Sequence, residues 1–570
     1  MHQVATSQNE FNALDALEFL NEAGAALSQE KDINRLLEII LTAATKITNA
    51  DGGTLYRLID GELKFEIVLN KSLNIKLGGT TGNPISFQAL PLHHPDGSPN
   101  NSMIAAYVAL EGKSVNIADA YASNLYVANG FDFSGTRNFD KQTGYRSTSF
   151  LTIPMENHEG EIIGVLQLLN AQVRSNVETN DHTDSCKHNG LGKVIAFTPE
   201  DQRLAESLAS QAAIALTNRM LITQLEMLFE SLIQLINTAI DDKSPYTGGH
   251  CERVPALTMM IADAASGAAN GPLAGFYMNE RDRYELKIAG LLHDCGKITT
   301  PVHVVDKATK LETIFDRIEF VAQRSEILKR DAEITMLRAQ LHVGMNGGDI
   351  AVAEFEYLSK LKQIDDDRCF LRRMNIGGER RGEQTLQSDL ARIKQIAAQL
   401  FVNEHGEVAA LLSQDEVNCL SIAAGTLTGA ERGVINHHID VTIKMLEALP
   451  WPKHLKNVPE FAGGHHERMD GRGYPRGLTR EQMSIPARIM GIADIFEALT
   501  ARDRPYKSGK TLTESLHILG NFKLNGHIDP DLFDLFVREK IYLKYAEQFL
   551  DAEQIDKVDE AAIPGYVPSR

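Results

Sequence analysis

Eight histidine and aspartate residues that are able to bind metal ions recur in the C-terminal half of the chain. They are His250, His293, Asp294, His437, His438, His465, His466 and Asp494. A single buried histidine is more often a hydrogen-bonded core residue than a ligand. A set of imidazole nitrogens and carboxylate oxygens, however, suits iron, manganese, zinc or nickel, and one Asp can bridge two ions. Because a two-metal site can clamp a phosphoryl oxygen during in-line displacement, the set predicts phosphodiester hydrolysis.

Most of these residues fall in segments with the apolar spacing of a helix. The segments are TGGHCERVPALTMMIADAA, YELKIAGLLHDCGKI, GVINHHIDVTIKML and IPARIMGIADIFEAL, with apolar residues three or four positions apart. Gly296 is expected to end the second helix, and Pro486 stands in the first turn of the fourth. We therefore expect helices that bring the candidate ligands together.

Two of the motifs resemble a known family. HDCGK, which begins at His293, and HHERMDGRGYP, which begins at His465, resemble the paired signature of HD-GYP phosphodiesterases. The likeness runs from roughly Leu225 to Leu519, apart from an insertion between LETIFDRIE and LTGAERGVINHH. It implies an all-α HD-superfamily domain that hydrolyses cyclic di-GMP to a linear dinucleotide and, in a slower step, to GMP.

The resemblance also implies a metal ligand set. The first ion would be held by His250, His293, Asp294 and Asp494, and Asp294 would bridge to a second ion held by His438, His465 and His466. His438 is preferred to His437 because of its family spacing to Leu446. Some members have a Glu that helps to bind a third metal where Tyr246 precedes Thr247 here. We therefore expect two divalent ions, with iron favoured and manganese next.

Further residues are expected to handle the substrate. Asp294 and Lys297 would be catalytic, because Lys297 can approach a phosphate oxygen and stabilise the charge that develops in the transition state. Arg504 and Lys507 in RPYK resemble the family's ligand-binding pair, and Tyr474 would also contact substrate.

Four more residues are predicted to support the site. They are Arg253, Asp470, Gly471 and Gly473. The glycines, with Tyr474 and Pro475, would shape the lip that admits substrate, because glycine permits a close backbone approach.

The N-terminal region mixes helix and strand patterns. Asp32 to Ile47 has helical spacing, whereas Gly53 to Val68 is strand-like, and SFLTIPMENHEGEIIGVLQLLNA reads as an antiparallel hairpin. An α+β domain is therefore expected.

The stretch NFDKQTGYRSTSFLTIPMENHEGEIIGVLQLLN resembles the second half of a GAF domain, particularly the GAF domains of phosphodiesterases that bind cyclic nucleotides. Asn170, Phe197 and Asp201 match that group's N-K, F and D-E signature, whereas Ala171 and Gln202 replace its Lys and Glu. The resemblance implies a GAF-like sensor domain with an unknown ligand, for which a cyclic nucleotide is one candidate.

These patterns divide the chain into five parts. They are an N-terminal helical segment (1–30), the GAF-like domain (31–175), a polar loop and linking helix (176–224), the HD-GYP domain (225–540, with a helical insertion at about 312–426) and a C-terminal tail (541–570). His182, Cys186 and His188 lack paired metal-ligand spacing, so a solvated loop is the expectation there. The helical pattern from Pro199 to Ile240 fits either a homodimerisation helix, common in GAF-linked signalling proteins, or an ordinary packed helix.

Composition limits the class of partner. The net charge of -19 argues against bulk nucleic acid as a partner, because polyanion affinity comes mainly from Lys and Arg. A small anionic nucleotide needs only a local basic pocket. With no apolar run long enough to span a membrane and five cysteines without CxxC pairing, we expect a cytoplasmic protein without disulfides.

Three functions are consistent with these features. The first is metal-dependent hydrolysis of cyclic di-GMP under control of the GAF-like domain. The second is a cyclic di-GMP receptor or docking module without turnover, and the third is a phosphodiesterase for a mixed cyclic GMP-AMP dinucleotide.

Overall fold

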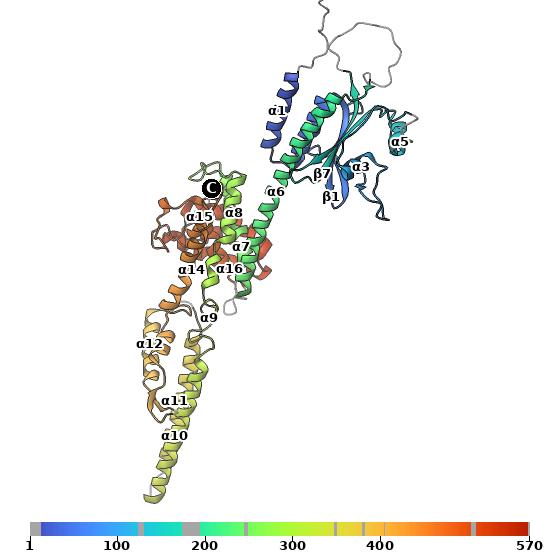
Figure 1. Ribbon diagram of the computed structural model, residues 1–570. Coiled ribbons are helices and arrows are strands. Elements are labelled where there is room, and N and C mark those ends of the chain that lie inside the picture. The colour runs from blue at the N-terminus through green and yellow to red at the C-terminus, as the bar shows by residue number, and fades with distance from the viewer. Residues whose placement is uncertain are drawn as a thin grey trace, which may run out of the picture. The chain divides into compact units, whose positions relative to one another are not determined.

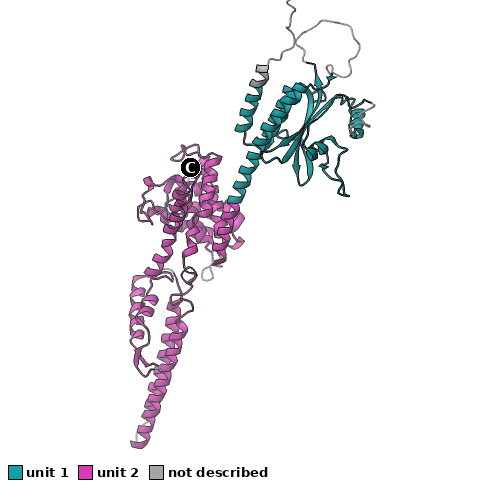
Figure 2. Cartoon of the chain, viewed as in Figure 1, with its two compact units in different colours: residues 1–229 teal, residues 230–570 magenta. Residues whose placement is uncertain are grey.

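The computed structural model describes residues 13–122, 130–173, 194–243, 249–346, 350–378, 382–403, 405–502 and 509–567. The chain forms two compact units, Met1–Phe229 and Glu230–Arg570 (Figure 2). Among the described residues, no helix is long and apolar enough to cross a membrane.

The first unit is built on an antiparallel sheet. Its described strands are β1 (Ala50–Ile59), β2 (Glu62–Asn70), β3 (Ile75–Gly78), β4 (Leu90–Pro91), β5 (Val115–Ile117), β6 (Phe150–Glu156), β7 (Ile162–Gln172) and β8 (Val194–Ile195). The order is β3-β2-β1-β7-β6-β5, with β4 paired to β2 and β8 to β7. The predicted hairpin is β6–β7, in which the side chain of Asn157 accepts hydrogen bonds from the amides of Glu159 and Glu161, both at 2.9 Å.

Helices cover both faces of this sheet (Figure 1). Leu55 and Leu166 pack with α1 (Ala13–Gln29), α2 (Ile33–Ile47) and the first part of α6 (Pro199–Lys243). Tyr56 and Val165, the neighbouring residues along the strands, face the opposite side with α3 (Ile104–Glu111). Side chains alternate between the faces of a strand, so a sheet covered on both sides needs apolar residues at successive positions.

The second unit is largely helical. Its principal helices are α7 (His250–Ser266), α8 (Glu280–Leu292), α14 (Gly429–Glu447), α15 (Val458–Gly463), α16 (Ile485–Thr500), α17 (Leu512–Leu524), α18 (Pro530–Arg538) and α19 (Ile541–Phe549). A 3-10 turn, η1 (Cys295–Thr299), and the short helix α9 (Val302–Val305) follow α8. Tyr545 on α19 is buried, with its ring 5.7 Å from that of Phe496 on α16, so residues beyond 540 complete the helical core.

The insertion forms a projecting arm (Figure 1), and its buried apolar side chains make a separate core. It contains α10 (Ile318–Asn346), α11 (Ile350–Asn375), α12 (Glu383–Ala397), α13 (Gln414–Leu420) and a short hairpin of β9 (Leu400–Val402) and β10 (Val408–Ala410). Its two ends meet at the base, where Thr426 Oγ1 donates to the carbonyl of Lys307 at 2.9 Å. Close by, the amide of Lys310 donates to the carbonyl of Asn375, the last residue of α11, at 2.8 Å.

Candidate metal centre

The seven predicted metal ligands come together at one place in the second unit. His250 begins α7, His293 and Asp294 directly follow α8, His438 lies on α14, His465 and His466 follow α15, and Asp494 lies on α16. Five of the seven are buried, namely His250, His293, Asp294, His438 and His465. The possible ligand atoms form three overlapping groups, and within each group they lie within 4.8 Å of one another. They are His250, His293 and Asp494; His293, Asp294 and His465; and His438, His465 and His466.

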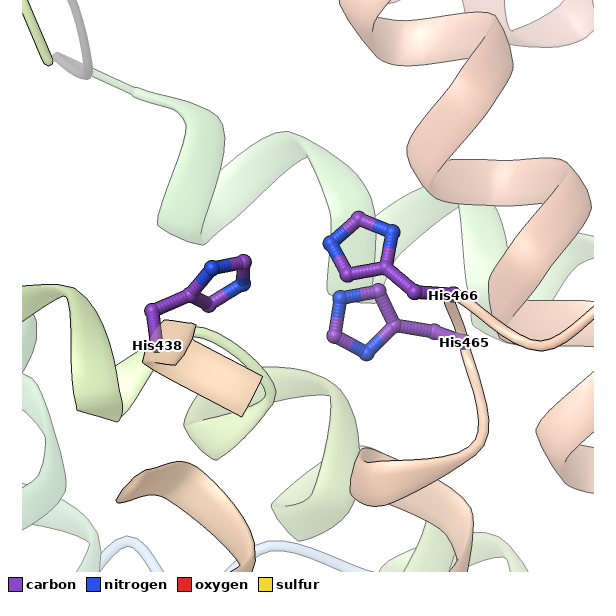
Figure 3. A group of neighbouring side chains, drawn as sticks. All are labelled: His438, His465 and His466. Atoms are coloured by element: carbon purple, nitrogen blue, oxygen red, sulfur yellow. The ribbon is translucent and has the colours of Figure 1, made fainter. Parts of the chain in front are cut away.

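Asp294 stands between the two ends of this cluster. Its Oδ2 lies 3.0 Å from His250 Nε2 and 3.3 Å from His293 Nε2. Its Oδ1 lies 3.2 Å from His438 Nε2. On the far side, His438 faces the adjacent pair His465 and His466 (Figure 3). One carboxylate oxygen is thus directed toward each group, as a bridging ligand requires.

Backbone hydrogen bonds set the tautomer of three histidines. The Nδ1 atoms of His293, His438 and His465 lie 2.8, 2.6 and 2.6 Å from the carbonyls of Gly290, Ile435 and Ala462. A carbonyl can only accept a hydrogen bond, so each Nδ1 carries the proton. In the neutral ring Nε2 then has a free lone pair, the form that binds a metal ion.

His250 is oriented by a carboxylate. Its Nδ1 lies 2.6 Å from Glu497 Oε2, while Glu497 Oε1 accepts a hydrogen bond from Arg253 Nε at 2.7 Å. Burial opposes the charge on Glu497, but His250 and Arg253 lower its pKa to about 2. Arg253 therefore contacts the site through Glu497. Sequence reasoning missed Glu497, although it lies on the same helix as Asp494, nearly one turn later.

Several buried polar atoms of the cluster lack a hydrogen-bond partner in the part of the chain that the structure describes, which bears on whether a cation fits there. Among the described residues, Asp294 Oδ1, His438 Nε2 and His465 Nε2 are buried side-chain atoms without a hydrogen-bond partner. The first two lie 3.2 Å apart, but both present lone pairs, so neither can donate to the other. Buried polar atoms rarely stay unpaired. A divalent ion would satisfy all three, so this donor set fits a metal site.

The protonation states of four of the proposed ligands also suit a metal ion. Burial lowers the pKa of His465 well below its usual value and lowers that of His466 to about 4, so both rings are neutral near pH 7. Burial opposes the charge on Asp294, but Lys297 and His293 hold its pKa well below the usual range. Burial likewise opposes the charge on Asp494, and neighbouring histidines lower its pKa. Neutral imidazoles and ionised carboxylates are the forms that coordinate metals.

The turn after α8 holds Asp294 and Lys297 side by side. The Lys297 ammonium contacts Asp294 Oδ2, and the amide of Gly296 donates to Thr442 Oγ1 of α14 at 2.9 Å. A Cβ atom on Gly296 would lie 2.0 Å from the carbonyl oxygen of His438. Glycine therefore permits the close approach that brings Asp294 to His438.

Tyr474 closes one side of the cluster. Its ring stacks on that of His466, with centroids 4.8 Å apart. The loop that carries Tyr474 is held by the buried Glu467, which accepts hydrogen bonds from the amides of Arg476 and Leu478 at 2.7 and 2.9 Å. Glu467 was not predicted, because HHERMDG gives no sign that this carboxylate turns inward.

The predicted supporting residues Asp470, Gly471 and Gly473 stabilise the conformation of this loop. Asp470 accepts hydrogen bonds from Arg468 Nε and from the amide of Arg472, both at 3.0 Å. Gly471 has a φ of 74°, and a Cβ on Gly473 would lie 2.4 Å from the amide nitrogen of Arg468. Both glycines therefore meet a backbone requirement.

Several other candidates are also placed. His437 is exposed beside Asp440, 3.1 Å away, and faces away from the buried cluster. Arg504 and Lys507 lie outside the described residues, as do Tyr246 and Thr247. The polar segment with His182, Cys186 and His188 lies outside them as well.

The GAF signature residues in the first unit have structural partners. Asn170 Oδ1 accepts from the amide of Thr148 at 2.7 Å, and its Nδ2 donates to Tyr145 Oη at 2.9 Å. Asp201 accepts from Thr198 at the start of α6, and Phe197 is buried in the core. Asn170 thus joins β7 to the loop before β6, and Asp201 caps the start of α6.

Family models match both parts of the chain. A GAF domain matches residues 32–216, and HD domains match residues 247–369 and 406–532. Among solved structures, the GAF domain of a phosphoenolpyruvate-protein phosphotransferase from Coxiella burnetii is 15% identical, with a TM-score of 0.26. That match covers 37% of this chain and 99% of that domain.

Curated relatives match shorter segments. A 3'3'-cGAMP-specific phosphodiesterase of Vibrio cholerae is 47% identical over 81 residues, 14% of this chain and 19% of the relative. A cyclic di-GMP phosphodiesterase of Pseudomonas aeruginosa is 39% identical over 114 residues, 20% of this chain and 26% of the relative. The chain thus spans less than a third of the length of either relative. It carries an N-terminal GAF domain followed by HD-domain sequence, and these two curated relatives are cyclic dinucleotide phosphodiesterases, the class that the HDCGK and HHERMDGRGYP motifs predicted.

Proposed function

We propose that this chain is a metal-dependent phosphodiesterase that opens a cyclic dinucleotide by hydrolysis. One observation carries the proposal: Asp294 directs one oxygen toward His250 and His293 and the other toward His438. Its Oδ1 and the Nε2 atoms of His438 and His465 are buried without hydrogen-bond partners among the described residues. Such an arrangement suits two ions that share a carboxylate.

The proposed ligands fall into two sets joined by Asp294. His250, His293, Asp294 and Asp494 would hold one ion, and Asp294, His438, His465 and His466 the other. Iron is the favoured metal, with manganese next. When bound, the ions would supply Lewis acidity and lower the pKa of an attacking water.

The chain's own residues would bind and orient the substrate. Burial opposes the charge on Lys297, but Asp294 and Asp494 raise its pKa, so the ammonium stays charged. It is a quarter exposed and can donate to a phosphate oxygen beside Asp294. Tyr474 would bound the site through its contact with His466. Arg504 and Lys507 are proposed substrate ligands on the family resemblance alone.

Cyclic di-GMP is the proposed substrate, and the mixed cyclic GMP-AMP dinucleotide is the alternative. Both rest on curated relatives, because one matching relative is specific for 3'3'-cGAMP and another is a cyclic di-GMP phosphodiesterase. The hydrolysis product would be a linear dinucleotide.

A homodimer through α6 is part of the proposal. Ile214, Leu221, Leu228 and Leu235 recur every seven residues, and Leu225 and Leu232 lie between them; all six are exposed. This is the spacing of a coiled-coil seam, and Asn218, seven residues before Leu225, occupies a position where Asn commonly fixes register. Dimerisation would bury the seam. Because α6 runs from the first unit into the second, the GAF domain would regulate hydrolysis through this helix.

The test is hydrolysis by anaerobically purified protein with its metal content measured. We expect turnover of cyclic di-GMP with about two ions per chain, and loss of both turnover and metal in Asp294→Ala. Asp440→Ala is the matched control, because Asp440 is an exposed carboxylate beside His437 on the same helix as His438. Parallel assays with 3'3'-cGAMP decide the substrate. Tight nucleotide binding without turnover, despite full metal loading, would instead favour the receptor function.

A further inference from the structure

The C-terminal end of α6 reaches the turn that carries Asp294 and Lys297. Lys243, the last residue of α6, donates from Nζ to the backbone carbonyls of Lys297 and Ile298, at 3.1 and 2.5 Å. Both carbonyls belong to η1, which directly follows Asp294. We infer that Lys243 is a positioning residue that fixes this turn, and with it the relative placement of Asp294 and Lys297.

The turn also has hydrogen bonds of its own, including one from Thr299 Oγ1 to the carbonyl of Gly296 at 3.0 Å, and one from the amide of Gly296 to Thr442 of α14. The amide of Lys297 donates to the carbonyl of Asp294 at 2.9 Å, and the amide of Thr300 donates to the carbonyl of Lys297 at 3.0 Å. These are single-turn bonds, and an isolated turn of this kind is weakly stable by itself. Two hydrogen bonds from the Lys243 ammonium to successive carbonyls therefore add to the bond between Gly296 and Thr442 in ordering this turn.

The C-terminal part of α6 also has contacts in the second unit that do not involve Lys243. Ile233, Asn237 and Ile240 are buried in the second unit, and Glu230 pairs with Lys287 of α8 at 3.0 Å. The exposed leucines 225, 228, 232 and 235 lie on the remaining surface of α6. A shift or rotation of α6 would therefore move η1 through the hydrogen bonds of Lys243. The ion pair between Glu230 and Lys287 connects α6 to α8 instead.

The inference rests on the proposed function for its kinetic test, but its structural test does not. In full-length protein, Lys243→Met removes the donor and keeps much of the side-chain volume. We expect faster hydrogen exchange at the amides of Lys297 and Thr300 and about a tenfold lower kcat, with KM changed less than twofold, equivalent to about 1.4 kcal/mol on the barrier. Lys243→Arg, which keeps a charged donor, should restore most of both values.

Lys287→Met is the matched control, because it breaks the Glu230 contact of α6 without touching η1. Unchanged exchange at Lys297 and Thr300 in Lys243→Met would overturn the inference. So would an equal increase in Lys287→Met, because the effect would then be a general loosening of α6. If the wild-type protein hydrolyses no cyclic dinucleotide, the proposed function fails, but the exchange comparison still decides the role of Lys243.

Discussion

Replacing Glu497 by Gln changes one charge next to the metal ligands and little else. Glu497 accepts from His250 with one oxygen and from Arg253 with the other. The amide keeps the shape but has only one acceptor. Its NH2 group must face either Arg253, where two donors would meet, or His250 Nδ1. In the second case, Nδ1 of a neutral ring must accept and Nε2 carries the proton, which blocks metal binding there.

The size of the effect follows from the electrostatics of the pair. The pKa of Glu497 is lowered from 4.5 to about 2 despite burial, which corresponds to about 3 kcal/mol in favour of the carboxylate. Burial opposes a charge on His250, but Glu497 and Asp294 raise its pKa to about 10, so an ion must displace a proton. A divalent ion gains more from the Glu497 charge than a proton does. We therefore expect the Gln variant to bind the ion that His250 would hold about 10- to 100-fold less tightly, a loss of about 1.4–2.7 kcal/mol.

The assay is a chelator competition titration of the reloaded protein, followed by turnover at saturating metal. One of two ions should be released early, and turnover should recover in part when metal is added in excess. Glu416→Gln is the matched control: Glu416 is a buried carboxylate paired with Arg324 in the arm, so it should lower stability and leave metal affinity unchanged. Equal metal affinity in wild type and Glu497→Gln would refute the reasoning.

Three other perturbations address separate parts of the structure. Gly296→Ala should destabilise the second unit by about 3 kcal/mol, because the new Cβ would lie 2.0 Å from the His438 carbonyl, and thermal unfolding would detect the loss. Leu228→Lys should shift the protein from dimer to monomer in sedimentation velocity, whereas Met227→Lys, off the seam, should not. Asn170→Ala removes hydrogen bonds to the amide of Thr148 and to Tyr145, and should destabilise the GAF domain by about 2 kcal/mol, read as faster hydrogen exchange confined to that domain.

The cluster of proposed metal ligands could be expected from sequence because each of these residues lies at a recognisable helix end or in a short motif. Glu497 and Lys243 were not, because a Glu or a Lys on a helix is usually solvated and only its partner reveals its role. Glu497 is buried through its contacts with His250 and Arg253, residues that lie far from it in the chain. Such partners become visible only when the helices are packed.

The inserted arm shows another limit of sequence reasoning. Its departure from the family pattern led us to expect an insertion at about residues 312–426, and apolar spacing indicated helices. The hairpin β9–β10 was not expected, since each strand has only three residues. Phe401 of this hairpin is buried in the arm's core with Ile393 and Leu411. Tertiary packing therefore stabilises strands that are too short to be recognised from their sequence pattern.

Two of the histidines proposed as metal ligands also complete the helices that present them. The last four carbonyls of a helix lack partners within it. The carbonyl of Gly290 is one of these in α8, and the carbonyl of Ala462 is one in α15. His293 and His465 donate to these carbonyls from Nδ1. The same bond caps the helix and fixes the ring, so that His293 Nε2 lies 3.3 Å from Asp294 Oδ2 and the buried His465 Nε2 has no hydrogen-bond partner among the described residues. One residue at each position therefore both ends the helix and orients a proposed ligand atom.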